Sequence, residues 1–383
     1  MILSKCTLRC SSIRSSSSVK QLFTQLVAQC APQLERRPRL HSGVGIIGAP
    51  FAKGQSKAGT DKGPAALRDG GLSGELQRLG WNVKDYGDLM LDTTTSNDEF
   101  QIENLELPST TTTSDIKKHN VQHISSVANA VENLSEAVAA VIQDGRLPIT
   151  LGGDHSLGIG SIFGHSRVVN ELCVIWVDAH ADINTLHTSK TGHMHGMPVS
   201  FLIKEVSNGI SRPAEILKYF HHIKPCVSAR NFAYIGLRDL DDAETNILRQ
   251  LEPQLTVYSI RDVDQLGIFE VTNRVLDRIN PALKLPIHVS FDIDAVDEYF
   301  APSTGTSVPG GLTIREAFCI GEQIAKTKRL SALDLVEVNP LIGSSHDVNR
   351  TVNCAINILL SFLGRNRLSL YARHPSKQFY GVQ

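Results

Sequence analysis

Residues 176–182 read WVDAHAD, which places Asp178, His180 and Asp182 at every second position directly after the apolar run of residues 172–177. In an extended chain, successive side chains point to opposite faces, so residues two apart share a face. On a helix the same spacing would spread the three side chains around the axis. The segment therefore predicts a buried strand whose end presents two carboxylates and an imidazole together.

Two further segments repeat this pattern of an apolar run that ends in polar residues. Residues 148–151 run into GGDHS, and residues 287–291 run into Asp-Ile-Asp. In open α/β sheets, binding sites form outside the carboxyl ends of the strands. Three such strands would aim six side chains at one point, namely His155, Asp178, His180, Asp182, Asp292 and Asp294.

This ligand set points to metal chemistry. Four carboxylates without cations would repel one another and raise each other's pKa, so two divalent ions would balance them. Oxygen-rich ligation with some imidazole favours Mn(II) over a thiolate zinc site, and none of the seven cysteines lies in these motifs. A single Asp-x-His or Asp-x-Asp is more often a turn or a helix cap than a ligand set. Three together predict a two-metal site, which activates water for hydrolysis.

The order of apolar patterns predicts the fold class. Strand-like runs alternate with helical patterns, which favours an α/β fold with a mostly parallel sheet and helices on both faces. Residues 91–115 are polar and rich in Thr and Ser, so we expect an exposed loop there. The strand-like runs are residues 44–47, 172–177, 232–235 and 287–291, and the helical patterns are residues 121–142 and 314–324.

Composition narrows the class of partner. The chain has 383 residues, of which 41% are hydrophobic and 20% charged, and its formal net charge is −1. No apolar stretch approaches the roughly 18 residues that would cross a bilayer, and no basic stripe suggests nucleic-acid binding. The cysteines are odd in number and scattered, so we expect reduced thiols rather than a disulfide framework. The expected partner is a small molecule, with neither membrane nor nucleic acid involved.

The first 34 residues have a separate character. They contain no Asp or Glu but carry four basic residues and a serine cluster, a composition typical of a transit peptide. An apolar stripe at helical spacing would suit an import receptor. We expect a mitochondrial transit peptide over residues 1–34 and a matrix location; the alternative, a disordered tail, would leave the protein in the cytoplasm. The stripe consists of Val19, Leu22, Phe23, Leu26 and Val27.

At this point the motifs resemble a known family. Residues 152–156, 177–182 and 290–294 are similar to the three signatures of the ureohydrolases, the arginase and agmatinase family. The resemblance extends over residues 44–367 and includes segments that match arginase in arginase order. These segments are residues 53–55, 63–68, 195–201, 234–239, 304–306, 310–311 and 337–340.

The resemblance implies an architecture. It implies a three-layer α/β/α fold with a mostly parallel eight-stranded sheet, a catalytic domain over residues 40–370 and a C-terminal tail over residues 371–383. It also implies a homotrimer, because Arg367 and Glu322 fall where arginases place an ion pair between subunits. Many exposed pairs of this kind contribute little stability, so the pair alone is weak support.

The resemblance also implies a reaction with two Mn(II) ions per subunit. A metal-bridging hydroxide would attack the guanidinium carbon of L-arginine and give L-ornithine and urea. Asp182 would accept a hydrogen bond from that hydroxide, Glu337 would orient the guanidinium, and His195 would shuttle protons to the leaving amine. His155, Asp178, Asp182 and Asp292 would bind one ion, and Asp178, His180, Asp292 and Asp294 the other.

The loop after the second signature bears on substrate choice. By resemblance, Asn184 and Thr191 would bind the α-carboxylate of arginine, which agmatine lacks. Further substrate contacts would come from Thr306, and from Asp241 and Glu244 at the α-ammonium. This set favours L-arginine over agmatine.

One residue of this loop departs from the family pattern. Arginases usually carry Ser-Gly-Asn where this chain has Thr191, Gly192 and His193. A protonated His193 would attract the substrate carboxylate, whereas a neutral one would only hydrogen-bond it, so substrate affinity would depend on pH. The alternative is a solvent-facing loop histidine with little role.

Two other functions stay open. The first is a ureohydrolase for another guanidino compound, such as agmatine or guanidinobutyrate, which the altered loop would allow. The second is a catalytically silent binding protein on the same fold. The presence of all six metal-type residues, His195 and Glu337 counts against the second.

Overall fold

A computed structural model describes residues 40–91, 100–101, 120–209 and 218–367. These residues belong to one compact unit, which begins at Leu40. The expected transit peptide and C-terminal tail lie outside the described residues, as do Cys6, Cys10 and Cys30. Among the described ranges, no helix is long and apolar enough to cross a membrane.

An eight-stranded sheet forms the middle of the unit, in the order β2-β1-β5-β10-β9-β6-β7-β8. Every neighbouring pair in this sheet is parallel, which confirms the expected parallel arrangement. The strands are β1 (Gly43–Ala49), β2 (Asn82–Asp88), β5 (Arg146–Gly152), β6 (Cys173–Val177), β7 (Phe232–Leu237), β8 (Thr256–Ser259), β9 (Ile287–Asp292) and β10 (Leu330–Val336).

The central strands are buried on both faces. All positions of β6, β9 and β10 are buried, as expected for strands of a parallel sheet covered by helices on each side. Such strands read as continuous apolar runs, and this is why the sequence locates them. The edge strand β2 is the opposite case, because all but one of its seven residues are exposed and it pairs only with β1.

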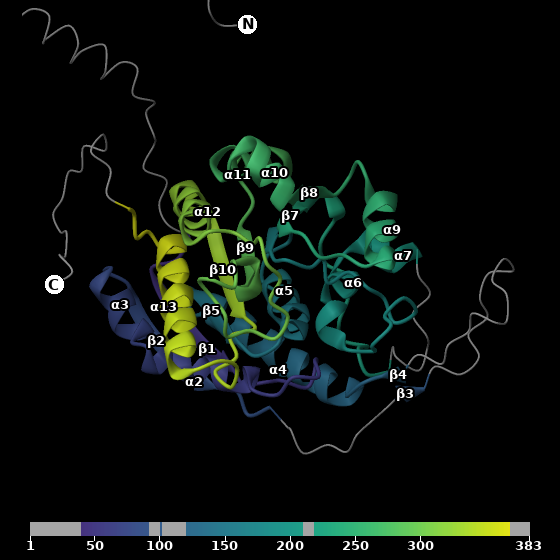
Figure 1. The fold of residues 1–383 in the computed structure, drawn as a ribbon, viewed down its shortest axis with the longest axis horizontal. Coiled ribbons are helices and arrows are strands. Elements are labelled where there is room, and N and C mark those ends of the chain that lie inside the picture. The colour runs from purple at the N-terminus through teal and green to yellow at the C-terminus, as the bar shows by residue number, and fades with distance from the viewer. Residues whose placement is uncertain (1–39, 92–99, 102–119, 210–217, 368–383) are drawn as a thin grey trace, which may run out of the picture. The chain divides into compact units, whose positions relative to one another are not determined.

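Helices cover both faces and complete three layers, as expected. On one face, α12 and α13 pack on β10 and α11 packs on β7 and β8, around a core that includes Val289 and Leu335; Figure 1 shows α13 in yellow with α12 above it. On the other face, α4 packs against α5, and α5 packs against α6. The helices are α2 (Gly63–Asp69), α3 (Leu72–Arg78), α4 (Ile124–Gln143), α5 (Gly158–Ser166), α6 (Pro198–Leu202), α7 (Lys204–Gly209), α9 (Asp242–Leu251), α10 (Ile260–Leu266), α11 (Ile268–Ile279), α12 (Ile314–Thr327) and α13 (Ser345–Phe362).

Two expectations about local structure are wrong in detail. The helical pattern of residues 121–142 begins as a helix only at Ile124, because His123 adopts a left-handed conformation with φ 50°. Val121 instead pairs with Phe100 in a two-stranded antiparallel ribbon of β3 (Phe100–Gln101) and β4 (Asn120–Val121). The stretch expected as a loop therefore contains one short strand.

The pair expected between subunits forms within the single chain. The guanidinium of Arg367 donates to both carboxylate oxygens of Glu322, at 2.9 and 3.0 Å, and its backbone N–H donates to one of them. This contact fastens the last described residue to α12. The pairing of these residues between subunits stays a prediction.

Candidate metal centre

Four adjacent strands bring the candidate site together at the carboxyl edge of the sheet. In spatial order these are β5, β10, β9 and β6, and each is followed or ended by a candidate residue. His155 follows β5, Glu337 follows β10, Asp292 ends β9 and Asp178 follows β6. Segments more than a hundred residues apart therefore meet because their strands are neighbours.

Each of the three signatures folds as the same tight turn. The Oδ1 atom of an aspartate accepts the backbone N–H two residues later, from Ser156 to Asp154 (3.0 Å), from His180 to Asp178 (2.7 Å) and from Asp294 to Asp292 (2.8 Å). This is an Asx turn, a conformation that aspartate favours. Asp178 and Asp292 are thus both turn residues and candidate ligands, whereas in the first signature the turn residue is Asp154 and the candidate ligand is His155.

The extended conformation expected through Asp182 is wrong beyond Val177. The strand β6 ends at Val177, and Asp182 adopts a left-handed φ of 50°. The Asx turn at Asp178 bends the chain, since its carboxylate takes the N–H that a continuing strand would present to a neighbour. Asp178, His180 and Asp182 still converge, but through a turn instead of a pleat.

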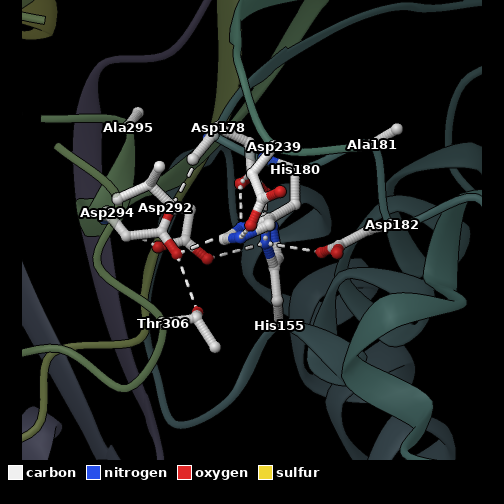
Figure 2. Close-up of polar contacts among 12 residues, drawn as sticks. His155, Asp178, His180, Ala181, Asp182, Asp239, Asp292, Asp294, Ala295 and Thr306 are labelled. Carbon is white, nitrogen blue, oxygen red and sulfur yellow. Dashed lines mark hydrogen bonds and ion pairs between the residues drawn. The ribbon is translucent and has the colours of Figure 1, made fainter. Parts of the chain in front are cut away.

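The first cluster surrounds one imidazole nitrogen. His155 Nδ1 lies 3.1 Å from Asp178 Oδ2, 3.2 Å from Asp182 Oδ2 and 3.1 Å from Asp292 Oδ2 (Figure 2). All four side chains are buried, and Nδ1 has no hydrogen bond of acceptable geometry. One N–H cannot serve three carboxylates, so this convergence of donor atoms fits a divalent cation rather than a proton.

The second cluster shares a carboxylate with the first. His180 Nδ1 lies 3.4 Å from Asp178 Oδ1 and 3.3 Å from Asp294 Oδ2. Two groups of three residues each bring their donor atoms close enough for one ion. The first group is His155, Asp178 and Asp292, and the second is Asp178, His180 and Asp294. Asp178 therefore lies between two adjoining sites, with one oxygen turned to each histidine.

The electrostatics of the cluster favour cations. Burial and the neighbouring Asp294 raise the pKa of Asp292 well above its usual range, and burial and Asp178 raise the pKa of Asp182 to about 6. Burial also raises the pKa of Asp178, but its contacts with His155 and His180 outweigh that effect and lower it. The carboxylates thus repel one another, and divalent ions would relieve a repulsion that otherwise draws in protons.

Residues around the clusters fix their orientation. The Trp176 ring stacks on His155 with centroids 3.9 Å apart, and its Nε1–H donates to Asp178 Oδ2 at 2.9 Å. Ser290 Oγ lies 3.0 Å from His155 Nε2, so the other ring nitrogen is left to face the carboxylates. Thr306 Oγ donates to Asp294 Oδ2 at 2.9 Å (Figure 2).

Glu337 and His195 lie together beside the first cluster. Glu337 is buried and has a left-handed φ of 64°, a strained conformation of the kind that persists at functional sites. Its Oε1 accepts the His155 backbone N–H at 2.9 Å and lies 3.5 Å from His195 Nδ1. Burial lowers the pKa of His195, but the contact with Glu337 outweighs it and raises the pKa to about 9.

Three of the residues expected at the amino-acid end, Asn184, Asp241 and Glu244, are linked by hydrogen bonds. Asn184 Nδ2 donates to Asp241 Oδ2 at 2.9 Å, and Asp241 caps α9 in a capping box with Glu244. Burial and the nearby Asp182 raise the pKa of Glu244 to about 8. Thr191 Oγ accepts the backbone N–H of His193 at 3.2 Å.

The surroundings of His193 disfavour its protonated form. Burial and the neighbouring His195 and His123 lower its pKa below the ordinary 6.5. The imidazole is therefore neutral at physiological pH, where it can hydrogen-bond a carboxylate without attracting it as a cation. Any pH dependence from this group falls on the acid side.

Several supporting residues escaped the sequence analysis. Trp176 and Ser290 each precede a candidate ligand by two positions on a strand, so the alternation that grouped the ligands could have found them. Thr188, whose hydroxyl donates to Asn184 Oδ1 at 2.7 Å, and Arg238 gave no such signal. Arg238 donates to backbone carbonyls, including those of Asp294 (2.6 Å) and Val308, which a local pattern does not reveal.

Comparison with known proteins places this site in a family. The model of the Arginase family matches residues 42–364. Arginase-1 of Bos taurus is 45% identical over 322 residues, which cover 84% of this chain and 92% of the bovine protein. Arginase-2, mitochondrial, of Homo sapiens is 44% identical over 329 residues, 86% of each chain.

Solved structures agree with the sequence relatives. The arginase of Bacillus subtilis has a TM-score of 0.70 and 32% identity, and covers 85% of this chain and 100% of its own. The arginase of Bacillus caldovelox has a TM-score of 0.72 at 32% identity, with the same coverage. The match spans the sheet and every turn described above, so the chain belongs to the arginase family and is an enzyme of the arginase type, a hydrolase.

Proposed function

We propose that this chain hydrolyses L-arginine to L-ornithine and urea at a centre of two Mn(II) ions. The observation that carries the proposal is the convergence of three buried carboxylate oxygens on His155 Nδ1 beside a second cluster that shares Asp178. The arginase relatives support the reaction, and the altered loop at His193 leaves substrate preference to be measured.

The two ions would be held by overlapping sets of residues. When bound, they would supply a nucleophilic water of lowered pKa next to the guanidinium carbon. Oxygen donors dominate each set, and this favours Mn(II) over softer ions. His155, Asp178, Asp182 and Asp292 would hold one ion, and Asp178, His180, Asp292 and Asp294 the other.

The remaining steps belong to side chains of this protein. The buried carboxylate of Glu337 would accept paired N–H groups of the planar guanidinium and hold its carbon over the cluster. Although burial lowers the pKa of His195, the contact with Glu337 outweighs it and raises the pKa to about 9, which favours the protonated imidazole at neutral pH. It would donate that proton to the nitrogen that leaves as the amine of ornithine.

The amino-acid end of arginine would lie at the loop between Asn184 and α9. Asn184, Thr191 and a neutral His193 would hydrogen-bond the α-carboxylate. Asp241 and Glu244 would face the α-ammonium, directly or through water, and Thr306 would complete the contacts near the metal end. The hydrogen bond from Asn184 to Asp241 supports a shared subsite for these two residues, and agmatine would forgo the carboxylate contacts.

Urea release tests this proposal. The Mn-loaded chain would be offered arginine, agmatine and guanidinobutyrate at equal concentrations, and initial rates would be compared. Preference for arginine by about tenfold or more is expected, because the groups that would hydrogen-bond the α-carboxylate are left unpaired by a substrate lacking one. Faster turnover of agmatine or guanidinobutyrate would make that compound the substrate in place of arginine. Release of no urea from any of the three would overturn the proposed reaction.

Location and assembly are further parts of the proposal. The acid-poor, basic segment of residues 1–34 supports import into the mitochondrial matrix ahead of a catalytic domain over residues 40–370 and a tail over residues 371–383. Import of a fluorescent fusion with and without residues 1–34 would test this location.

The proposed assembly is a homotrimer with Arg367 and Glu322 paired between subunits. Analytical ultracentrifugation of the parent and Arg367→Ala would test it.

A further inference from the structure

A buried glutamine touches the carboxylate that the proposed reaction relies on. Gln55 is 7% exposed, and its Nε2–H donates to Glu337 Oε2, across 282 residues of sequence. The opposite oxygen, Oε1, accepts the His155 backbone N–H. The two oxygens of Glu337 are thus held by two different segments.

Two hydrogen bonds, one to each oxygen, restrict the rotation of the Glu337 carboxylate more than a single one would. The terminal torsion of a glutamate is broad, so a carboxylate anchored at one oxygen can still turn about its own axis. Anchors on Oε1 and Oε2 together fix the plane of the carboxylate. A planar guanidinium makes paired hydrogen bonds only with a carboxylate in its own plane.

The neutrality of Gln55 matters as well as its position. A Lys or Arg at this point would neutralise Glu337 and compete with the guanidinium of the substrate. An amide donates a hydrogen bond and leaves the negative charge in place.

The surroundings hold the glutamine itself in place. Gly54 N–H donates to Asp154 Oδ2 at 2.7 Å, and the carbonyl of Gly54 accepts the His195 backbone N–H at 3.0 Å. A Cβ at Gly305 would lie 2.9 Å from Gln55 Oε1, and Lys57 Nζ donates to the carbonyl of Gly305. The amide is therefore packed between the segment after β1 and the loop that carries Thr306.

We infer that Gln55 is a positioning residue that sets the plane of the Glu337 carboxylate for the guanidinium of the substrate. This inference rests on the proposed function. Gln55 does not contact either metal cluster in the described structure and acts through Glu337 alone. It should affect the reacting end of the substrate and leave the amino-acid end untouched.

The experiment compares two substitutions of similar volume. Gln55→Met removes the donor, and Gln55→Glu replaces it with a group that donates only when protonated. We expect kcat for arginine to fall by about 10- to 100-fold in Gln55→Met, the scale of a misplaced reacting group. Binding of ornithine, which has no guanidinium, should stay within about twofold of the parent by calorimetry, and Mn content should be unchanged.

Gln55→Glu adds a signature that a structural role would not produce. Its introduced carboxyl can share a proton with Glu337 at low pH, but loses it as pH rises, and two carboxylates then repel each other. The variant should therefore lose kcat/KM on the alkaline side, in a limb that the parent lacks. The matched control is Gln323→Met, a buried glutamine on α12 whose amide contacts Cys319 instead of the site; it should keep parental kcat.

Each result decides between distinct claims. If Gln55→Met has parental kcat and Gln55→Glu has a parental pH profile, the inference is overturned while the proposed function stands. Equal losses of ornithine binding and kcat in Gln55→Met would also overturn it, because they would indicate collapse of the whole site. A parent that releases no urea from any guanidino substrate overturns the proposed function and the inference with it.

Discussion

Replacing Trp176 with Phe tests how strongly the surroundings of the ligands determine metal affinity. The indole Nε1–H donates to Asp178 Oδ2, the carboxylate shared by both clusters, at 2.9 Å, and the ring stacks on His155. Trp176→Phe keeps an aromatic ring but removes the donor. The shared carboxylate then loses one of the contacts that orient it.

The size of the effect follows from that one hydrogen bond. A hydrogen bond to a charged group contributes about 1.5–3 kcal/mol, and each 1.4 kcal/mol is about tenfold in affinity. Loss of a partner behind a metal ligand weakens binding by about 10- to 100-fold, which is the same range. We therefore expect Mn(II) to bind about 10- to 100-fold more weakly, at both sites, because Asp178 belongs to both.

The assay is titration of the metal-free protein with Mn(II), followed by calorimetry well below the unfolding temperature. Trp81→Phe is the matched control, because Trp81 is the other of the two tryptophans in the chain. Its indole N–H donates to the backbone carbonyl of Leu363 at 2.9 Å, away from the metal clusters. This control should lose stability but bind Mn(II) like the parent. Affinity within twofold of the parent in Trp176→Phe would show that the indole N–H does not contribute to metal binding through Asp178.

Three other substitutions test the substrate loop, a buried histidine and a glycine at the start of the first signature. In His193→Asn, KM for arginine should run parallel to the parent above pH 7 and diverge only on the acid side, because the pKa of His193 is lowered; divergence above pH 7 would contradict this. His165 is the second test. Burial and, to a smaller extent, the neighbouring His288 lower the pKa of His165 well below 6.5, so the unfolded chain takes up a proton that the folded chain does not. Stability should fall as pH drops below about 6.5, and urea unfolding of His165→Asn should show a shallower fall. Gly153→Ala would place a Cβ 1.7 Å from the carbonyl oxygen of Phe51, and should lower the free energy of unfolding by about 3 kcal/mol, the upper end for overpacking; calorimetric unfolding within 1 kcal/mol of the parent would show that the backbone yields.

The sequence predicts the centre of the fold better than its margins. Strands such as β6 and β9 are buried on both faces, so they read as apolar runs that end where the ligands begin. The edge strand β2 reads NVKDYGD and has no such run, because it pairs on one side only and faces solvent. The short strand β3 pairs with β4 across a long intervening segment, which no local pattern predicts.

The same contrast holds within the site. Asp178, His180 and Asp182 are predictable as a group, although a turn rather than a pleat brings them together. The bond of Gln55 to Glu337 is not predictable, since it joins residues 282 positions apart and depends on β1 and β10 lying on either side of β5. Local spacing therefore identifies candidate ligands, whereas the groups that orient them follow from the order of strands in the sheet.

The most direct test of the central claim is the number of Mn(II) ions bound per chain in the parent, Asp294→Asn and Asp178→Asn, measured by plasma mass spectrometry after equilibrium dialysis. The clusters share Asp178 but not Asp294. We expect about two ions in the parent, about one in Asp294→Asn and fewer than one in Asp178→Asn, with urea release from arginine falling in step. One ion in the parent, or equal binding by all three proteins, would contradict the two-metal centre.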